Sequence, residues 1–246
     1  MRIALTCLAL LLSTTISTTT GAHSSGCRLA VIVDGMERPE YSANGSTYIE
    51  ALRGRNYSLR LTNPTPYRVA AALSVDGLNT IDAKHTNAWR AAKWLLDPYE
   101  SIEIEGWQVS DSTARRFFFT GERNSYGAAL GQTQNLGVIE VIFYRERVPD
   151  RELRQGLERK RDASAPEAGA MSMPDDDYAA TGMGGRTEHG VVRVDVDLDP
   201  HPIASARIRY EFRPQLVKLG VIPRDRAPIE RREKARGFER YCPEPD

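Results

Sequence analysis

Three features of the sequence predict a mainly β protein, an antiparallel β-sandwich of jelly-roll-like type. Several short runs between residues 57 and 144 alternate apolar and polar residues, as strands with one buried face do. Turn signals rich in proline, glycine, asparagine and aspartate separate these runs at roughly ten-residue spacing. Aromatic and β-branched side chains, which fit a pleated surface, are concentrated in the same runs. A long flexible insertion and short C-terminal helices complete the predicted architecture.

The N-terminal segment has the layout of a secretory signal peptide, which we place at residues 1–22. Met1-Arg2 supplies a positive end, residues 3–12 form a short apolar run, and small residues follow. A helix that crosses a bilayer of about 30 Å needs a longer apolar run than any in this sequence. We therefore expect a secreted or periplasmic protein without a transmembrane segment.

The cysteines that remain after residue 22 are Cys27 and Cys242. Two cysteines in an exported protein most simply form a disulfide, which requires the first and last parts of the fold to meet. The alternative is a lipoprotein in which Cys27 carries the lipid, although Ser24 stands where an apolar residue is usual.

Residues 27–148 are expected to form the first part of the sandwich. The alternating run at residues 57–61 stops at Asn63-Pro64-Thr65-Pro66, where two prolines cannot donate to a ladder. The apolar run at residues 67–75 ends at Asp76-Gly77, a dipeptide that favours a tight turn because it adopts positive φ readily. Residues 137–144 are the most strand-like run and predict a central strand. The other strand candidates are residues 29–33, 47–50, 101–107 and 116–120.

The composition changes after residue 148. Residues 149–190 begin with charged residues and become rich in alanine, glycine, serine and proline, so they bury too little apolar surface to offset the entropy of ordering. We expect a mobile linker or insertion there. Residues 191–246 are expected to supply two completing strands and a helical segment. We place the strands at 191–198 and 203–212, a hairpin connection at 199–202, and helices at 215–219 and 228–236.

Charge and motif content exclude several classes of function. The sequence has 33 lysines and arginines and 33 aspartates and glutamates, and this balance argues against general nucleic-acid binding. There is no Gly-x-Ser-x-Gly elbow and no phosphate-binding loop. The four histidines lack the close spacing typical of metal sites, so we expect neither a metal nor a cofactor. They are His23, His85, His189 and His201.

Two groups of aspartates offer weaker candidates for chemistry. The aspartates of the first group would share one face of a strand and could help to hold Ca²⁺, although a solvated strand face explains them as well. The second group could contain a carboxylate pair for glycoside hydrolysis, although turn chemistry explains two of its members. The groups are Asp195, Asp197 and Asp199, and Asp76, Asp82 and Asp97.

Four aromatic residues within nineteen positions are the best candidates for a binding surface. If Trp89, Trp94, Tyr99 and Trp107 line one groove, their rings could stack on sugars or grip an extended peptide. The simpler alternative is that two or more of them fill the core of the sandwich. Trp107 lies on the same face of its predicted strand as Glu103 and Glu105, so we expect its ring to face solvent.

Several segments together resemble an uncharacterised family of exported bacterial β-rich proteins. They are residues 75–79 (VDGLN), 96–99 (LDPY), 104–107 (IEGW), 125–126 (SY), 135–139 (NLGVI), 209–212 (RYEF) and 235–238 (ARGF). The resemblance covers nearly all of the chain after the signal peptide. It implies a bacterial envelope setting but no activity, because no role is known for that family.

The sequence therefore predicts a non-catalytic binding module or a structural module of the cell envelope. Its partner would be a glycan, an extended peptide or another envelope protein. Two alternatives remain open: a carboxylate-dependent hydrolase that acts on glycans, and a surface protein that assembles through an exposed sheet edge.

Overall fold

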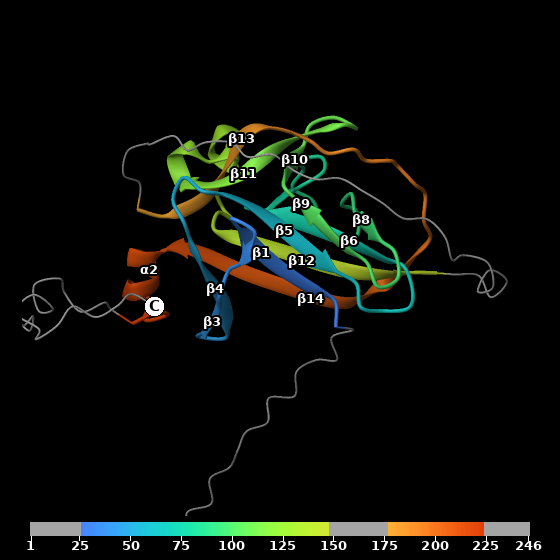
Figure 1. The fold of residues 1–246 in the computed structure, drawn as a ribbon, viewed down its shortest axis with the longest axis horizontal. Coiled ribbons are helices and arrows are strands. Elements are labelled where there is room, and N and C mark those ends of the chain that lie inside the picture. The colour runs from blue at the N-terminus through green and yellow to red at the C-terminus, as the bar shows by residue number, and fades with distance from the viewer. Residues whose placement is uncertain (1–25, 148–176, 224–246) are drawn as a thin grey trace, which may run out of the picture.

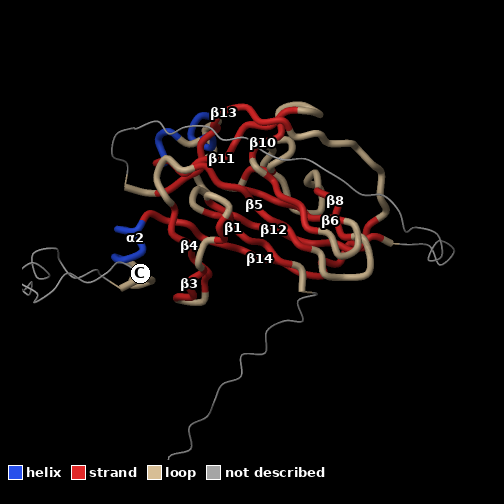
Figure 2. Tube along the Cα trace, viewed as in Figure 1, coloured by secondary structure: helices blue, strands red, loops and turns tan. Residues whose placement is uncertain are grey.

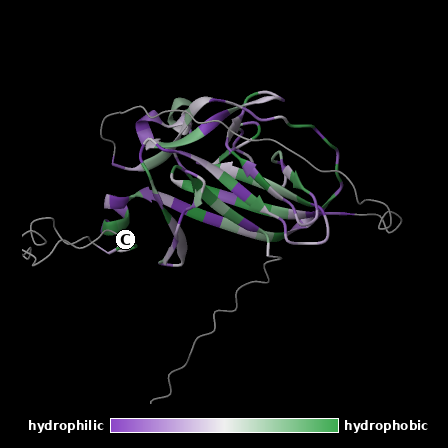
Figure 3. Ribbon diagram, in the orientation of Figure 1, coloured by the Kyte–Doolittle hydropathy of each residue, from purple (hydrophilic) through white to green (hydrophobic). Residues whose placement is uncertain are grey.

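The strands pair into two sheets that pack on each other, and hydrophilic and hydrophobic residues alternate along the long strands (Figures 1 and 3). The structure is a computed structural model that describes residues 26–147 and 177–223. The predicted mainly β sandwich is confirmed, and Figure 2 shows the few short helices, in blue, at one side of the molecule. Among the described strands all pairs are antiparallel except β4 with β14. The jelly-roll arrangement stays a prediction.

The first layer, called here the β5 sheet, is built around β5, which pairs with β1 on one side and with β9 and β11 on the other. Its strands are β1 (Arg28–Val33), β2 (Met36–Glu37), β5 (Asn56–Thr62), β9 (Ser101–Ile104), β10 (Gly106–Gln108), β11 (Thr113–Gly121) and β13 (Ala179–Glu188).

The second layer, called here the β12 sheet, has β12 at its centre between β6 and β14, as predicted for a central strand. Its strands are β3 (Glu40–Ala43), β4 (Ser46–Ala51), β6 (Val69–Val75), β7 (Leu78–Asn79), β8 (Trp94–Leu96), β12 (Val138–Glu146) and β14 (Leu198–Phe212).

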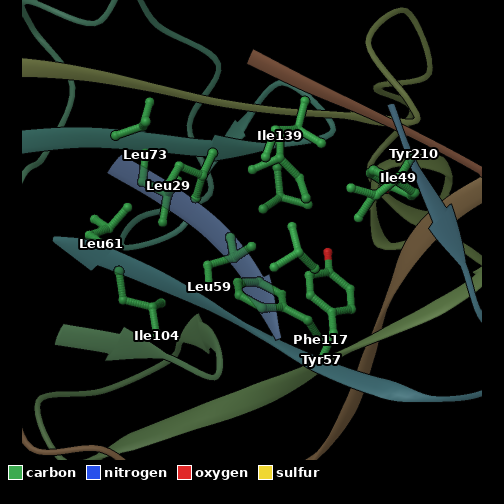
Figure 4. Packing of buried hydrophobic residues seen from close by; sticks show 14 of the residues in the cluster. Leu29, Ile49, Tyr57, Leu59, Leu61, Leu73, Ile104, Phe117, Ile139 and Tyr210 are labelled. Carbon is green, nitrogen blue, oxygen red and sulfur yellow. The ribbon is translucent and has the colours of Figure 1, made fainter. Parts of the chain in front are cut away.

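The core lies between the two sheets. Leu59 and Leu61 of β5 face Leu73 of β6 and Ile139 of β12, and each of these side chains is at most 1% exposed (Figure 4). Removing such side chains from water contributes roughly 25 cal/mol per Å² of apolar surface, which is the main force that holds the layers together. Aromatic rings extend this core at one end, where Tyr57 stacks on Phe119 at 4.2 Å between ring centroids.

The predicted mobile linker, residues 149–190, includes a segment that is a strand. Residues Ala179–Glu188 form β13, which pairs along β11, so the linker prediction is wrong for this segment. Its glycines, which suggested a flexible segment, make room for a neighbouring ring. A Cβ atom at Gly182 would lie 2.3 Å from the ring of Phe118. The small residues of β13 thus reflect close packing. The rest of the predicted linker, residues 149–176, lies outside the described residues.

The two completing strands predicted near the C-terminus are in fact one. β14 runs continuously through the hairpin predicted at residues 199–202, whereas residues 191–197 form no strand. Irregular pairing near Tyr144 of β12 accommodates Pro200 and Pro202, because a proline cannot donate to a regular ladder.

Short helices follow the strands at two places. η1 (Glu122–Asn124) and α1 (Tyr126–Ala129) follow β11, and α2 (Arg213–Lys218) follows β14 at the position of the first predicted C-terminal helix. The second predicted helix, residues 228–236, lies outside the described residues. The predicted signal peptide and Cys242 also lie outside the described residues, and the disulfide from Cys27 to Cys242 stays a prediction.

Candidate functional site

A groove of about 360 Å³ lies on the outer face of the β12 sheet. Its floor consists of outward-facing residues of β6 and β12, among them Ser74, Glu140 and Ile142, which alternate with core residues such as Val141. Two segments form its walls, one at residues 84–91 and the other at residues 134–136.

The groove carries more positive than negative charge. Lys84, Arg207 and Arg209 line it against a single carboxylate, that of Glu140, so its net charge is plus two with His85 neutral. Arg207 lies opposite Glu140 across β14 and β12 and donates to its Oε1 atom from both Nε (3.1 Å) and an Nη (2.6 Å). Glu140 is therefore already neutralised by a neighbour.

The other two cations are available to a ligand. Lys84 lies 3.6 Å from Asp82, but its side chain is 72% exposed, and an exposed pair of this kind contributes little stability. Arg209 is exposed, and within residues 26–147 and 177–223 it has no hydrogen-bond or ion-pair partner. Together they make the groove suited to an anion.

Both walls of the groove are attached to the turn at Asp76-Gly77. Both residues have positive φ, 53° and 77°, as the sequence predicts for this dipeptide. His85 Nδ1 bonds to the Gly77 carbonyl oxygen at 2.9 Å, and this holds the first wall. In the second wall, Asn135 packs closely on Gly77. A Cβ atom added at Gly77 would lie 2.8 Å from the Asn135 side chain. The turn therefore contacts both walls of the groove.

The carboxylate of Asp76 points the other way, into the protein, and is 2% exposed. Its Oδ1 atom accepts from Gly137 N (2.9 Å) and from the Tyr210 hydroxyl (2.5 Å). Its Oδ2 atom accepts from Thr181 N (2.8 Å). The backbone N–H of Asp76 donates to Val138 O (2.8 Å). A buried carboxylate is costly unless it is fully hydrogen-bonded, and these donors satisfy it.

Three hydroxyl groups continue this network from one sheet to the other. Thr181 Oγ1 lies 2.6 Å from both the Tyr210 and the Tyr57 hydroxyl oxygens. Because Tyr210 donates to Asp76, Thr181 donates to Tyr210 and accepts from Tyr57. We call Asp76, Tyr210, Thr181 and Tyr57 the Asp76 cluster. Asp76 lies in the turn after β6 and Tyr210 in β14, on the side of the β12 sheet, whereas Thr181 and Tyr57 belong to the β5 sheet.

Burial governs the titration of this cluster. It raises the pKa of Asp76 to about 6, although the hydrogen bonds from Tyr210, Thr181 and Gly137 oppose that rise. Burial also raises the pKa of Tyr57 and Tyr210 well above the ordinary tyrosine value, and the nearby Asp76 charge acts in the same direction. The tyrosines therefore stay protonated and act as donors.

The structure does not bring the four predicted aromatic residues into one groove. Trp107 is 2% exposed, so the expectation that its ring faces solvent is wrong. The chain changes partner after β9, from β5 to β11, and this interrupts the alternation at Glu105 and turns Trp107 inward against Phe117. Trp94 is also in the core, where its Nε1–H donates to Thr80 Oγ1 at 2.9 Å.

The other two aromatic residues are exposed but lie apart. Tyr99 is 71% exposed in the turn between β8 and β9 and does not line the groove. Trp89 is 45% exposed and lies between Ala88 and Ala91, which do line it. The Trp89 ring contacts Tyr144 edge to face, with 5.3 Å between centroids. Trp89 is thus the predicted binding residue that adjoins the groove.

The candidate aspartates are used elsewhere in the fold. Asp76 is buried in its cluster, and the 67% exposed side chain of Asp97 lies 3.2 Å from Arg68. Asp195 and Asp197 precede β14, so they do not share a strand face with Asp199. The described part of the chain contains no group of three or more His, Cys, Asp or Glu residues arranged to hold a metal ion.

No protein-family model, curated protein or solved structure matches this chain. Across residues 26–147 and 177–223, no helix has the length and apolar character needed to cross a membrane. The fold and the site thus define a β-sandwich with a cationic groove on its outer face. The alternation of Arg207 and Arg209 with buried residues of β14 was a signal for this groove, but their neighbours become visible only in the folded chain.

Proposed function

We propose that this chain is a ligand-binding module of the cell envelope and that its ligand occupies the groove on the β12 sheet. The observation that carries the proposal is the excess of cationic side chains in that groove, with Arg209 lacking a partner among the described residues. A concave site lined by a few polar groups is the usual form of a small-molecule or glycan site.

The chemistry of the groove favours binding over hydrolysis. Glycoside hydrolysis requires two carboxyl groups that flank the scissile bond, roughly 5 to 10 Å apart. The groove is lined by one carboxylate, Glu140, and Arg207 holds it in an ion pair through two hydrogen bonds to Oε1. The hydrolase predicted as an alternative would need a second acid at the site.

The proposed setting outside the cytoplasm rests on the sequence. The signal-peptide pattern at residues 1–22 and the resemblance to exported bacterial proteins both support it. We keep the pairing of Cys27 with Cys242 as part of this proposal, because an oxidising compartment would favour it.

A groove-filling variant tests the proposed function. Ser74 is on the floor, so Ser74→Trp places a large ring in the groove while leaving the core face of β6 unchanged. We expect calorimetric titration with envelope glycans and acidic peptides to find a ligand that binds the wild type and loses affinity at least tenfold with this variant.

The matched control is Ser101→Trp, which adds the same ring to exposed β9 of the opposite sheet. This variant should bind like the wild type, and circular dichroism should show both variants folded. Equal binding by the wild type and folded Ser74→Trp would disprove the assignment of the groove.

A further inference from the structure

We infer that the ligand is an acidic oligosaccharide, whose anionic group binds Lys84 and Arg209 while a sugar ring farther along stacks on Trp89. This inference rests on the proposed binding function and specifies the ligand class. Four features of the groove lead to it: its two available cations, its aromatic end, its polar lining and the strands that form its floor.

The cations lie where an anion can reach them. Arg209 is opposite Val138 on β12, at one end of the groove floor, and Lys84 lines the adjoining wall. A guanidinium group can bind a carboxylate through two parallel hydrogen bonds, and an ammonium group adds a point charge. Glu140, the carboxylate in the same groove, is held by Arg207 and does not compete for Arg209.

The aromatic end lies farther along the same strand. Tyr144 is on the outer face of β12 after Val138, Glu140 and Ile142, and Trp89 rests against it. Tyr144 lies six positions after Val138 along the strand, which is about 20 Å at roughly 3.3 Å per residue. An anionic group at Arg209 and a ring on Trp89 therefore require an extended ligand of several sugar units.

Trp89 is positioned to present its ring to a ligand. The Lys93 ammonium group donates to the backbone carbonyl of Trp89 (2.6 Å) and to that of Ala91 (2.9 Å), which holds this part of the wall. The indole is 45% exposed, an unusual exposure for a side chain of this size. An amphipathic ring of this kind suits the apolar face of a sugar.

The polar lining of the groove suits hydroxyl groups. Thr86, Gln134 and Asn135 supply hydroxyl and amide groups that can both donate and accept hydrogen bonds. Sugar hydroxyls also both donate and accept, so this lining complements a carbohydrate chain.

A bound peptide strand fits the groove less well. Extended peptides usually bind by adding a strand to an open sheet edge, where backbone groups are unpaired. The floor here is formed by β6, β12 and β14, and β12 is paired with a strand on each side. A peptide over this face would find few backbone partners.

The test compares uronic-acid oligosaccharides of four to eight sugars with the same oligosaccharides after reduction of their carboxyl groups. Isothermal titration calorimetry would use the purified chain that begins after the signal peptide. We expect binding of at least one acidic oligosaccharide and at least tenfold weaker binding of its reduced form. Binding should also weaken as salt rises, because the contact is ionic.

Variants should separate the two ends of the site. Lys84→Gln combined with Arg209→Gln should weaken acidic binding at least tenfold and remove the preference over the reduced form. Trp89→Ala should weaken both forms about equally. The controls are Lys218→Gln, at an exposed position of α2, and Tyr99→Ala, which remove a remote charge and a remote aromatic ring and should change nothing.

Equal binding of acidic and reduced oligosaccharides would overturn the inference, and so would tighter binding of a glutamate-rich hexapeptide. Absence of any oligosaccharide binding would also overturn it. If a ligand of another class binds and Ser74→Trp abolishes that binding, the proposed function stands and only the ligand class is wrong. If Ser74→Trp changes no binding, the proposed function itself fails.

Discussion

The Asp76 cluster and the groove lie on opposite sides of one turn, and they treat charge in opposite ways. Inside, the Asp76 carboxylate is 2% exposed and accepts hydrogen bonds from Gly137, Thr181 and Tyr210. Outside, Arg209 is exposed and has no partner within the described residues. The buried charge is committed to the fold, whereas the exposed charge can be used by a ligand.

This difference follows from the cost of leaving a polar group unpaired. A buried donor or acceptor without a partner costs about 1 to 3 kcal/mol, so the fold must satisfy each one around Asp76. An exposed guanidinium is satisfied by water and carries no such cost until a ligand displaces that water. Changes to the Asp76 cluster should therefore alter stability, and changes to the groove should alter binding.

The largest effect should come from Asp76→Ala. This change leaves Gly137 N–H and Thr181 N–H without an acceptor and removes the partner of Tyr210. We expect the free energy of unfolding to fall by about 3 to 5 kcal/mol in urea titration. Glu140→Ala is the matched control in the groove and should cost no more than about 1 kcal/mol. Similar losses for the two variants would refute the contrast.

The pH dependence should show the same contrast. The pKa of Asp76 is about 6 in the folded protein and 3.8 in the unfolded chain, so the folded state binds a proton more readily. The stability that this group contributes is full below about pH 4 and is lost as pH rises through 6. The loss is at most about 3 kcal/mol, at 1.36 kcal/mol per pKa unit.

Urea titrations of the wild type and of Asp76→Asn from pH 4 to 8 would measure this loss. The variant cannot titrate at this position, so its difference from the wild type isolates Asp76. If the difference in free energy of unfolding between wild type and variant stays constant with pH, the pKa of Asp76 is not raised. The same holds if the difference moves in favour of the wild type as pH rises.

A smaller effect should distinguish the two tyrosines of the cluster. Tyr210→Phe removes the donor to Asp76 and a partner of Thr181, whereas Tyr57→Phe removes only the bond to Thr181. We expect losses of about 2 to 3 kcal/mol and about 1 kcal/mol respectively in chemical denaturation, since bonds to charged groups are stronger. Equal losses would mean that the hydrogen bond from Tyr210 to Asp76 adds no stability beyond that of the bond to Thr181.

The smallest effect on stability should come from Glu140→Gln, which removes the ion pair with Arg207. Both side chains are partly exposed, so the free energy of unfolding should change by less than about 1 kcal/mol. The same change frees Arg207 and should tighten binding of an acidic oligosaccharide several-fold in calorimetry. Weaker binding would mean that Glu140 itself contacts the ligand.

Local pattern was sufficient for much of the fold. The alternation at residues 57–61 and the apolar run at 67–75 correspond to β5 and β6, and the predicted central strand at 137–144 corresponds to β12. The Asp76-Gly77 turn has the positive φ values expected of it. Prediction failed at β13, where glycines indicated a linker although they pack against Phe118.

The candidate site was harder to predict because it joins distant segments. Trp89 was one of four aromatic candidates, and nothing local separated it from Trp94 and Trp107, which are buried. Trp107 turns inward because the strand partner changes at Glu105, a feature of the sheet and not of the residues around it.

The sequence by itself determined the two-sheet β class, most of the strands and the turn at Asp76, because period-two alternation and turn chemistry depend on neighbouring residues. Only the tertiary structure decided that Asp76 is buried and that Arg209 is exposed in a groove. Asp76 meets Thr181 and Tyr210 across separations of 105 and 134 residues. Burial and hydrogen-bond partners arise from such long-range contacts, which no local pattern encodes.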